Sequence, residues 1–549
     1  MTDERKLSES RVSKRIYKSL DDAFNEIGRY GRYQLFCLLV IQLLCIPSAT
    51  QMSTGFFRLG GLVPDYQCLD SNNTFYLTSN EVRRNSSHAC SMVKGCSNLQ
   101  THNAWVSIYE EFMWVCEPDY IGSTISSLLP ILHLIAHFFS GHVSDYLGRK
   151  WLYVFGMAAR LICSIAEALS PTWQIYMIFN VVAHFLGVLP TSAAFSLVVE
   201  TVHSDHRMIQ GFAFQYSIGM ILTGICAYFI GHWRRLLLIM NIFGIPAVFL
   251  LGFFVESPRF LIQNGKYQQA ATSMNRIAWF NGKDTRFTAD DMHMIQSFSA
   301  SHAPRNKKYT FWHLFSNWRL ASYSISQMIT GISVNILHAV IFFNIQDLSG
   351  NPLMNVSLMG LLRLWTPFIA ILLETKFKQF GRKRLMVGSL SMTMLCFMVM
   401  LVIDVLELPG TARTIGTSAV MLGYSIQAGL VWIAYKLYTT ELFPTVIRSI
   451  ALGTFSIAAQ FGSIVGPQLI YIRKYWHSAP YAACVCALFL ATVLAAILLP
   501  ETKSEGLLDT VHDAKRRLLA FERSQQKRSL ILTSKDEQTS PEQQPLTKI

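Results

Sequence analysis

The sequence predicts an all-α membrane protein whose twelve transmembrane helices form two six-helix bundles. Three observations predict this fold class. Apolar residues make up 51% of the 549 residues and charged residues only 15%, whereas soluble domains carry roughly 25% charged residues. Twelve runs of predominantly apolar residues are long enough to cross a bilayer as helices. Several short polar motifs also recur six apolar runs after their first appearance.

The elements follow one another in a simple order. A charged segment, 1–33, has no apolar core, so we expect no cleavable signal peptide and expect the first apolar run to act as the membrane address. The predicted spans are 34–57, 120–140, 151–169, 173–197, 211–230, 236–255, 320–345, 353–374, 385–406, 414–437, 449–471 and 479–499. This divides the chain into the segment 1–33, a first bundle 34–255 with an outer loop 58–117, a central loop 256–319, a second bundle 320–499, and a polar, largely disordered tail 500–549.

Loop charge predicts the orientation. The formal net charge of +13 is concentrated in the N-terminal segment, the central loop, the segment near 380 and the tail, and no nucleic-acid-binding pattern accompanies it. The loop 58–117 instead holds four basic and six acidic residues. By the positive-inside rule, both termini and the central loop face the cytoplasm of a plasma-membrane protein, and the loop 58–117 faces outside.

The outer loop carries its own support for this topology. Its four cysteines, Cys68, Cys90, Cys96 and Cys116, predict two disulfides with three pairings open. Glycosylation sequons begin at Asn72 and Asn85 in the same loop. The seven other cysteines lie in apolar segments, where a small buried side chain is the simplest interpretation.

A repeat relates the two halves. GHVSDYLGRK at 141–150 is echoed by KQFGRKR at 378–384, ESPRFL at 256–261 by ETKSEG at 501–506, and Glu200 precedes Arg207 by the seven residues that separate Glu441 from Arg448. Two six-helix halves related in this way are typical of transporters that bind substrate between the halves. We expect these charges to hold the cytoplasmic face shut and to separate for inward opening. The candidate gating residues are Gly141, Asp145, Gly148, Arg149, Glu200, Arg207, Glu256, Arg259, Arg382, Glu441, Arg448 and Glu501.

These motifs carry a family resemblance. GHVSDYLGRK resembles the loop signature G-x-[LIV]-[AS]-D-[RK]-x-G-R-[RK] of the major facilitator superfamily and departs from it only at Tyr146. Nearly the whole chain, from about 20 to 510, resembles the organic cation, carnitine and organic anion transporter family within it. The stretches that carry this second resemblance are DDAFNEIGRYGRYQ (21–34), WVCEPDY (114–120), AYFIGHWRRL (227–236), VESPRFLIQNGKYQQA (255–270), ELFPTVIRSIALG (441–453) and LPETKSEGL (499–507).

The resemblance implies a fold of the major facilitator type and transport of a small organic ion by alternating access, either facilitative or coupled to sodium or a proton. The sequence departs from the family where its members commonly place an Arg and, four residues on, a Gly, because Asn180 and His184 stand there. In the eleventh helix Gln460 replaces the Asp of many cation carriers and the Arg of many anion carriers. A sugar-porter-like carrier and a transporter-like receptor or scaffold without transport activity stay open as alternatives.

Candidate substrate-binding residues are ionisable, polar or aromatic side chains inside apolar runs, which are costly there unless they serve a function. They are Lys436, Gln460, Arg363, Arg160, Tyr216, Trp432 and Tyr435. Arg160 and Glu167 are seven residues apart, so they fit a structural pair on one helix face as well as a site. Because little central acidity balances these cations, the cavity favours anions or zwitterions over simple cations.

Other classes of site find little support. His133 and His137 share a helix face, but no further ligand completes a metal site, and packing or a wet cavity is the simpler role. The sequence has no Walker A, G-x-S-x-G, H-E-x-x-H or dinucleotide-binding motif, so we expect neither an enzyme nor a cofactor. The expected partners are a small organic ion, a coupling ion and the lipid bilayer.

Overall fold

A computed structural model describes most of the chain between its two ends. The described residues are 17, 19–56, 63–70, 74–102, 105–117, 120–203, 206, 210, 214–302, 311–345, 348–366, 368–369, 372, 381–443, 445–473 and 475–501. Within these ranges, nine helices are long and apolar enough to cross a membrane, and three shorter apolar helices accompany them. Together they correspond one for one, in order, to the predicted spans.

The helices of the first half cover the first six spans. They are α3 (Arg32–Phe56), α7 (Tyr120–Leu147), α8 (Arg149–Ala168), α9 (Trp173–Val188) continued by α10 (Thr191–Val199), α12 (Ser217–Ile230) and α13 (Trp233–Leu251). The break between α9 and α10 lies at Pro190, which has no backbone N–H to continue the hydrogen-bond ladder.

The helices of the second half cover the other six spans. They are α17 (Trp318–Phe343), α18 (Pro352–Leu364), α20 (Arg382–Val405), α21 (Thr411–Ile426) continued by α22 (Trp432–Leu442), α23 (Thr445–Ile472) and α24 (Ala479–Leu498). A five-residue π-helix, η7 (Gln427–Val431), joins α21 to α22. Such π segments inside helices are rare and often lie at functional sites.

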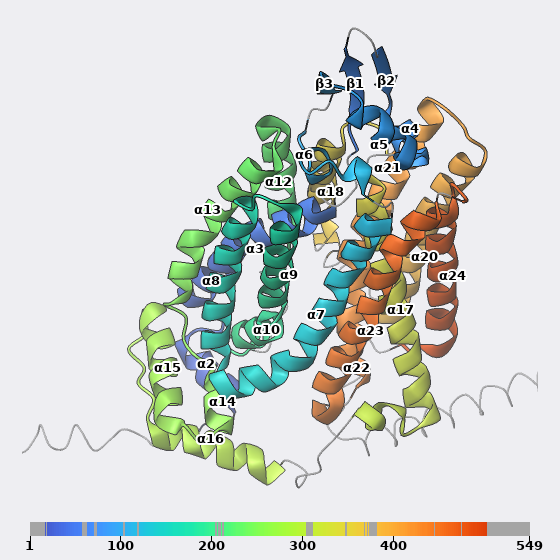
Figure 1. Cartoon of the computed structure of the whole chain (residues 1–549). Coiled ribbons are helices and arrows are strands. Elements are labelled where there is room, and N and C mark those ends of the chain that lie inside the picture. The colour runs from blue at the N-terminus through green and yellow to red at the C-terminus, as the bar shows by residue number, and fades with distance from the viewer. Residues whose placement is uncertain are drawn as a thin grey trace, which may run out of the picture.

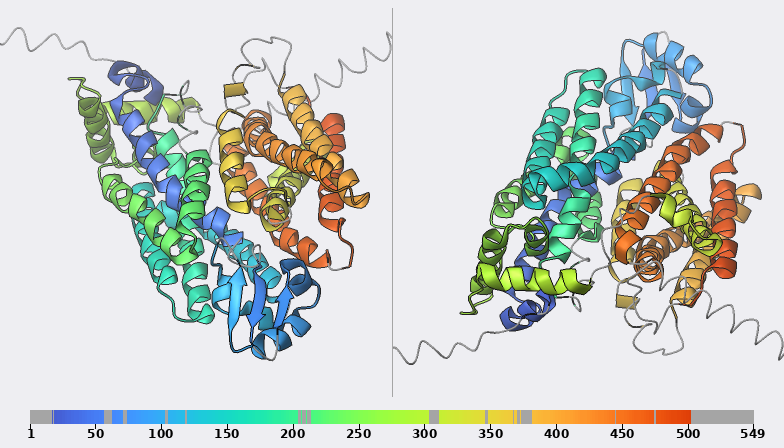
Figure 2. Two further views of the ribbon diagram at one scale, coloured as in Figure 1. Left: turned by 90° about the horizontal axis from the view of Figure 1, so that it is seen from above. Right: turned by 90° about the horizontal axis from the view of Figure 1, so that it is seen from below.

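The two halves form two groups of helices that lie side by side, as seen from above and below in Figure 2. They meet where α7 packs against α23 and where α12 packs against α18. Glycines permit the second contact, since a Cβ on Gly360 would lie 2.9 Å from the carbonyl oxygen of Ser217. Figure 1 shows α7 running obliquely, from beneath the β-strands at the top toward α14 (Pro258–Gln263) at the bottom.

A small domain occupies the top of Figure 1, and we call this side of the protein the sheet side. It holds a three-stranded antiparallel sheet of order β2-β1-β3 that the sequence did not lead us to expect. Its elements are β1 (Asp65–Leu69), β2 (Thr74–Leu77), β3 (Leu99–His102), α4 (Ser79–Arg84), α5 (Ser86–Lys94), α6 (Ile108–Glu111) and the 3₁₀ turn η2 (Trp114–Cys116). Buried apolar side chains on the sheet and on α4 and α5 give the domain its own core.

Helices also form where the sequence suggested only charged or loop segments. They are α2 (Leu20–Ile27), α14, α15 (Tyr267–Phe280), α16 (Ala289–His302) and the 3₁₀ turn η5 (Phe311–Phe315). The first four form what we call the helical cap, and their side of the protein is the cap side, at the bottom of Figure 1. The apolar face of α2, with Phe24 and Ile27, is buried in one cluster with residues of α14 to α16 such as Ile277.

An asparagine fastens the two parts of the helical cap together. The Oδ1 atom of Asn281 accepts a hydrogen bond from the Tyr33 N–H at 2.9 Å, and its Nδ2 donates to the Ile27 carbonyl at 3.1 Å. Asn281 follows α15, whereas Ile27 and Tyr33 flank the turn between α2 and α3. The N-terminal segment is thereby tied to the loop that follows the sixth span.

Candidate functional site

Arg160 lies near the middle of α8, and its guanidinium forms hydrogen bonds with neutral side chains of α3. Its Nε and Nη2 atoms donate to Gln51 Oε1 at 3.0 and 2.9 Å, and its Nη1 donates to Ser48 Oγ at 2.5 Å. Gly187 on α9 leaves room for the side chain, because a Cβ there would lie 2.8 Å from Arg160 Cδ. Ser48 and Gln51 were not predicted as site residues. The signal that could have found them is that both are polar residues inside an apolar run.

Glu167 is fully buried near the sheet-side end of α8. Its Oε1 accepts from Asn180 Nδ2 at 2.8 Å, and its Oε2 accepts from Gln51 Nε2 at 3.4 Å. Gln51 thus links Arg160 to Glu167 across two turns of α8. The carboxylate is held by two neutral amides, those of Asn180 and Gln51.

Arg363 joins the two halves from the end of α18. Its Nη2 donates to Gln215 Oε1 at 3.1 Å, and Gln215 belongs to the first half. Its Nε is buried and has no hydrogen-bond partner among the described residues. Tyr216, the next residue after Gln215, is half-buried and lies within electrostatic range of both Arg160 and Arg363.

Lys436 on α22 also reaches across to the first half. Its ammonium lies 5.5 Å from the centroid of the Phe195 ring on α10, a distance suited to a cation–π contact. The side chain is exposed, and it lies within electrostatic range of Arg363. Arg363 and Lys436 therefore reach from the second half to the first, and Tyr216 connects them to Arg160, because it lies within electrostatic range of both arginines.

The other predicted binding residues lie on α22 and α23 of the second half. Trp432 is half-buried and packs edge-on against Tyr435, with ring centroids 5.4 Å apart. Tyr435 is buried, and its hydroxyl donates to the Phe455 carbonyl at 3.4 Å, which makes it a packing residue of the second half. Gln460 is half-buried on α23, and the structure does not bring it together with the cationic side chains.

His133 pairs with a histidine on another helix. Its Nε2 lies 3.2 Å from His184 Nδ1 on α9. His137 is half-buried one turn further along α7. Within the described part of the chain, no group of three or more His, Cys, Asp or Glu side chains is arranged to hold a metal ion.

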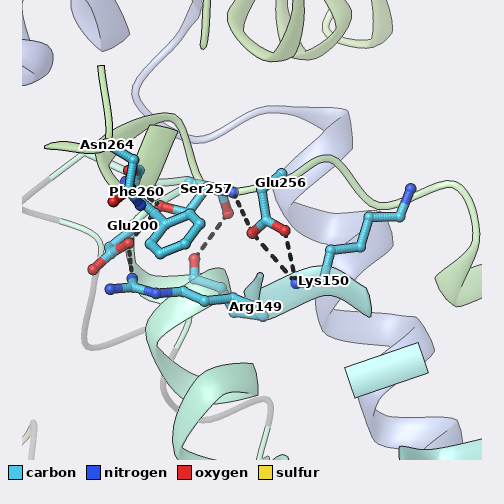
Figure 3. Close-up of polar contacts among 9 residues, drawn as sticks. Arg149, Lys150, Glu200, Glu256, Ser257, Phe260 and Asn264 are labelled. Atoms are coloured by element: carbon cyan, nitrogen blue, oxygen red, sulfur yellow. Dashed lines mark hydrogen bonds and ion pairs between the residues drawn. The ribbon is translucent and has the colours of Figure 1, made fainter. Parts of the chain in front are cut away.

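On the cap side, a cluster of charges joins α8, α10 and α14 (Figure 3). Arg149 forms an ion pair with Glu200, and the same carboxylate accepts a hydrogen bond from the Ser257 hydroxyl. The guanidinium of Arg149 lies 5.3 Å from the centroid of the Phe260 ring. All of these residues belong to the first half or to α14, so the cluster fixes one joint within that half.

Glu256 adds a second interaction at the same joint. Its carboxylate accepts from the backbone N–H of Lys150 at 3.1 Å and from that of Ser257 at 3.0 Å, which places negative charge at the N-terminus of α8. Gly148 permits this arrangement for two reasons. Its φ of 86° favours glycine, and a Cβ there would lie 2.8 Å from Glu256 Oε2.

The equivalent contact recurs in the second half. Glu501 accepts from the backbone N–H of Arg382 at 2.7 Å and from that of Lys383 at 3.3 Å, at the N-terminus of α20. A Cβ on Gly381 would overlap this carboxylate. The internal repeat of the sequence thus corresponds to a repeated geometry. In each half, an acidic residue that follows the sixth membrane helix caps the N-terminus of the third.

Several predicted gating residues lack a described side chain. Arg207 lies outside the described residues. For Gly141, Asp145, Glu441 and Arg448 the structure describes only the backbone. Arg259 is half-buried on α14.

The small sheet-side domain, formed by the predicted outer loop and for that reason called the outer domain below, contains both predicted disulfides and shows their pairing. Cys68 pairs with Cys96 at a Cα–Cα distance of 6.0 Å, and Cys90 pairs with Cys116 at 4.9 Å. Asn85 is exposed, and its side chain caps α5 by accepting from the His88 N–H at 3.2 Å. Asn72 lies outside the described residues.

We expect each disulfide to stabilise the outer domain by about 2 to 4 kcal/mol, because each closes a loop of 28 or 26 residues. Replacing both members of a pair by serine should lower the apparent melting temperature of the purified protein and reduce its surface level. Replacing Cys226, a cysteine of α12 outside the pairs, is the control. Unchanged melting of a double serine variant would contradict the prediction.

The outer domain is fastened to the first half. Glu111 accepts from Trp233 Nε1 at 2.6 Å and from Arg234 Nε at 2.8 Å, at the start of α13. Next to them His232 Nδ1 accepts from the Arg234 N–H at 3.2 Å. Burial lowers the pKa of His232, outweighing the opposite influence of Glu111, so the ring stays neutral and remains a hydrogen-bond acceptor at neutral pH.

Comparisons with known proteins agree with this architecture. The family model described as "Sugar (and other) transporter" matches residues 71–511. An "Organic cation transporter-like protein" of Drosophila melanogaster is 24% identical over 96% of this chain and 97% of its own length. The human "Organic cation/carnitine transporter 2" is 26% identical over 74% of this chain and 71% of its own length.

Among solved structures, the inward open conformation of the xylose transporter XylE from E. coli resembles the fold with a TM-score of 0.58. It is 17% identical and covers 86% of this chain and 97% of its own. The family match spans well over half of the chain. The fold, the internal repeat and the relatives all agree with it. The chain belongs to the sugar (and other) transporter family of the major facilitator superfamily, a family of multi-pass membrane transporters rather than enzymes.

Proposed function

We propose that this transporter moves small organic ions that carry a carboxylate, as anions or zwitterions, by alternating access between its two halves. The observation that carries the proposal is the group of cationic side chains formed by Arg160, Arg363 and Lys436. Glu167, the acid linked to this group through Gln51, already accepts hydrogen bonds from amides. The group is therefore suited to an anionic ligand.

Arg363 is the residue that we propose as the main contact of the substrate carboxylate. Its Nη2 binds a neutral amide oxygen of the opposite half, and its Nε is without a partner among the described residues. A guanidinium offers several N–H donors in a fork that matches a carboxylate. Lys436 supplies a second charge within electrostatic range, and Tyr216 and Trp432 are aromatic side chains that could contact an organic moiety.

The contacts between the halves support alternating access. On the sheet side, Ser127 Oγ donates to the Ile464 carbonyl at 2.9 Å, and Ser357 Oγ donates to the Ile221 carbonyl at 3.0 Å. We infer that these contacts break when substrate enters from the sheet side.

The relatives named for organic cations and carnitine support an organic ion as substrate. Loop charges support a plasma membrane location with both termini cytoplasmic, which places the disulfide-bonded domain outside the cell. In this orientation the exposed Asn85 is a candidate glycosylation site. A coupling ion, sodium or a proton, is part of the proposal.

Uptake into oocytes tests this function. A labelled small organic cation, a carnitine-like zwitterion and a dicarboxylate are compared with and without sodium and at two pH values, with labelled xylose as the sugar probe. We expect the zwitterion or the dicarboxylate to be taken up, and Lys436→Ala to reduce that uptake. Cation uptake alone would overturn the charge assignment, and uptake of xylose alone would favour a sugar carrier. Surface-expressed protein that moves none of the probes would favour a receptor or scaffold.

A further inference from the structure

A cavity of about 560 Å³ lies on the cap side, away from the junction of the two halves. One wall is the turn from α7 to α8, with Gly148 and Trp151, and the opposite wall is formed by α14 and α15, with Lys266, Gln269 and Ser273. None of the residues proposed to bind substrate lines this cavity. We propose that it binds the headgroup of an anionic phospholipid from the adjacent membrane leaflet.

The position of the cavity matches the headgroup level of a bilayer. Trp151 lies in the first turn of α8, a membrane-spanning helix, and is 49% exposed. It stacks on Phe155, which is 62% exposed one turn deeper, with ring centroids 5.5 Å apart. Exposed aromatic side chains at the end of such a helix are typical of the membrane interface. The cavity therefore opens beside lipid.

The polar residues that line the cavity favour phosphate. Glu256, its acidic residue, already accepts hydrogen bonds from the Lys150 and Ser257 N–H groups. Lys266, Gln269 and Ser273 line the opposite wall, and the exposed Lys266 and Gln269 bring an ammonium and an amide to the cavity. These three residues follow the i, i+3, i+7 spacing, so they lie along one face of α15.

The start of α15 adds to this preference. Lys266 is the N-cap residue of α15, so its ammonium lies at the positive end of the helix dipole. Lys150 adds a positive charge next to Trp151, since its Nζ donates to the Gly252 carbonyl at 2.9 Å and lies 5.0 Å from the centroid of the Trp151 ring. Basic groups next to an anionic leaflet attract its lipids. A bound headgroup would contact α15 on one side and Trp151 on the other, and so brace the joint that Glu256 forms.

Native mass spectrometry of the full-length protein in micelles that contain phosphatidylserine and phosphatidylcholine tests this site. We expect the wild type to retain phosphatidylserine preferentially, and Lys266→Ala to bind it about fivefold more weakly. Lys283→Ala, which removes an exposed lysine outside the cavity, is the matched control and should bind as the wild type does. Gln269→Trp, an exposed position whose larger side chain would fill the cavity, should lose retention without a change in charge.

Equal retention of phosphatidylserine by the wild type and by both cavity variants would overturn the proposal. Equal retention of phosphatidylcholine and phosphatidylserine would overturn the preference for an anionic headgroup. Glycerophosphoserine that competes as well as the intact lipid would show a site for soluble phosphate compounds in place of a lipid site. The test needs no transport measurement, so its result is independent of the proposed function.

Discussion

Uptake of the carboxylate-bearing substrate should fall about tenfold to a hundredfold when Arg363 is replaced by methionine. A hydrogen bond to a charged group contributes about 1.5 to 3 kcal/mol, and about 1.4 kcal/mol corresponds to a factor of ten. Methionine keeps much of the length of the side chain and removes every donor. The measurement is initial uptake rate in oocytes, divided by the amount of protein at the surface.

Two further variants separate substrate binding from structural support. Arg363→Lys keeps the charge but loses the forked donors, so we expect an intermediate rate with a raised KM. Gln215→Leu removes the acceptor of Arg363 in the first half without removing a charge, and it should change uptake less than Arg363→Met does. If Arg363→Met transports the anionic probe at the wild-type rate, this arginine does not bind substrate. If all three variants lower uptake equally, its role is to join the halves.

The fold could be predicted from the sequence because membrane spans depend on local composition. A run of about 20 apolar residues is a helix whatever surrounds it, since the bilayer offers backbone groups no other partner. The repeat was visible because the joints of each half use the same chemistry, an acid that caps a helix after a glycine, as Gly148 and Glu256 show. Both signals, the apolar runs and the repeated motifs, can be recognised within short stretches of the sequence.

The contacts of the site could not be predicted because they depend on how helices are rotated against one another. The seven-residue spacing placed Arg160 and Glu167 on one face, but it did not reveal that Gln51 of α3 lies between them. The pattern of His133 and His137 suggested a pair on one helix, whereas the structure places His133 against His184 of another. Disulfide pairing was open for the same reason, since it depends on the fold of the outer domain.

The second large effect should follow from replacing Glu200 by glutamine. The side chains of Arg149 and Glu200 are only 15% and 18% exposed, so the variant leaves a largely buried guanidinium without its counter-charge. Removing one partner of a buried ion pair costs about 3 to 5 kcal/mol, and partial exposure should reduce this to about 2 kcal/mol. We expect a lower apparent melting temperature in detergent and less protein at the cell surface.

A double-mutant cycle distinguishes the loss of the pair from a general effect of substitution. Arg149→Gln combined with Glu200→Gln leaves no unpaired charge, so the double variant should be more stable than the sum of the two single losses predicts. Glu256→Gln is the comparison, because this carboxylate accepts backbone N–H groups and should not couple to Arg149. Strictly additive losses would show that Arg149 and Glu200 do not stabilise each other.

The same cycle tests what the cluster does during transport. From the sequence we expected these charges to hold the cytoplasmic face shut and to separate for inward opening, and in the structure Arg149, Glu200 and Ser257 contact one another within the first half and α14. A joint inside one half should move as a unit in both states, so its loss should lower stability and surface level while the uptake rate per surface molecule changes little. A gate would instead change the balance between states, and the accessibility of a cysteine introduced at Gln460 would change in Glu200→Gln. Altered accessibility in a variant of normal stability would therefore return these residues to a gating role.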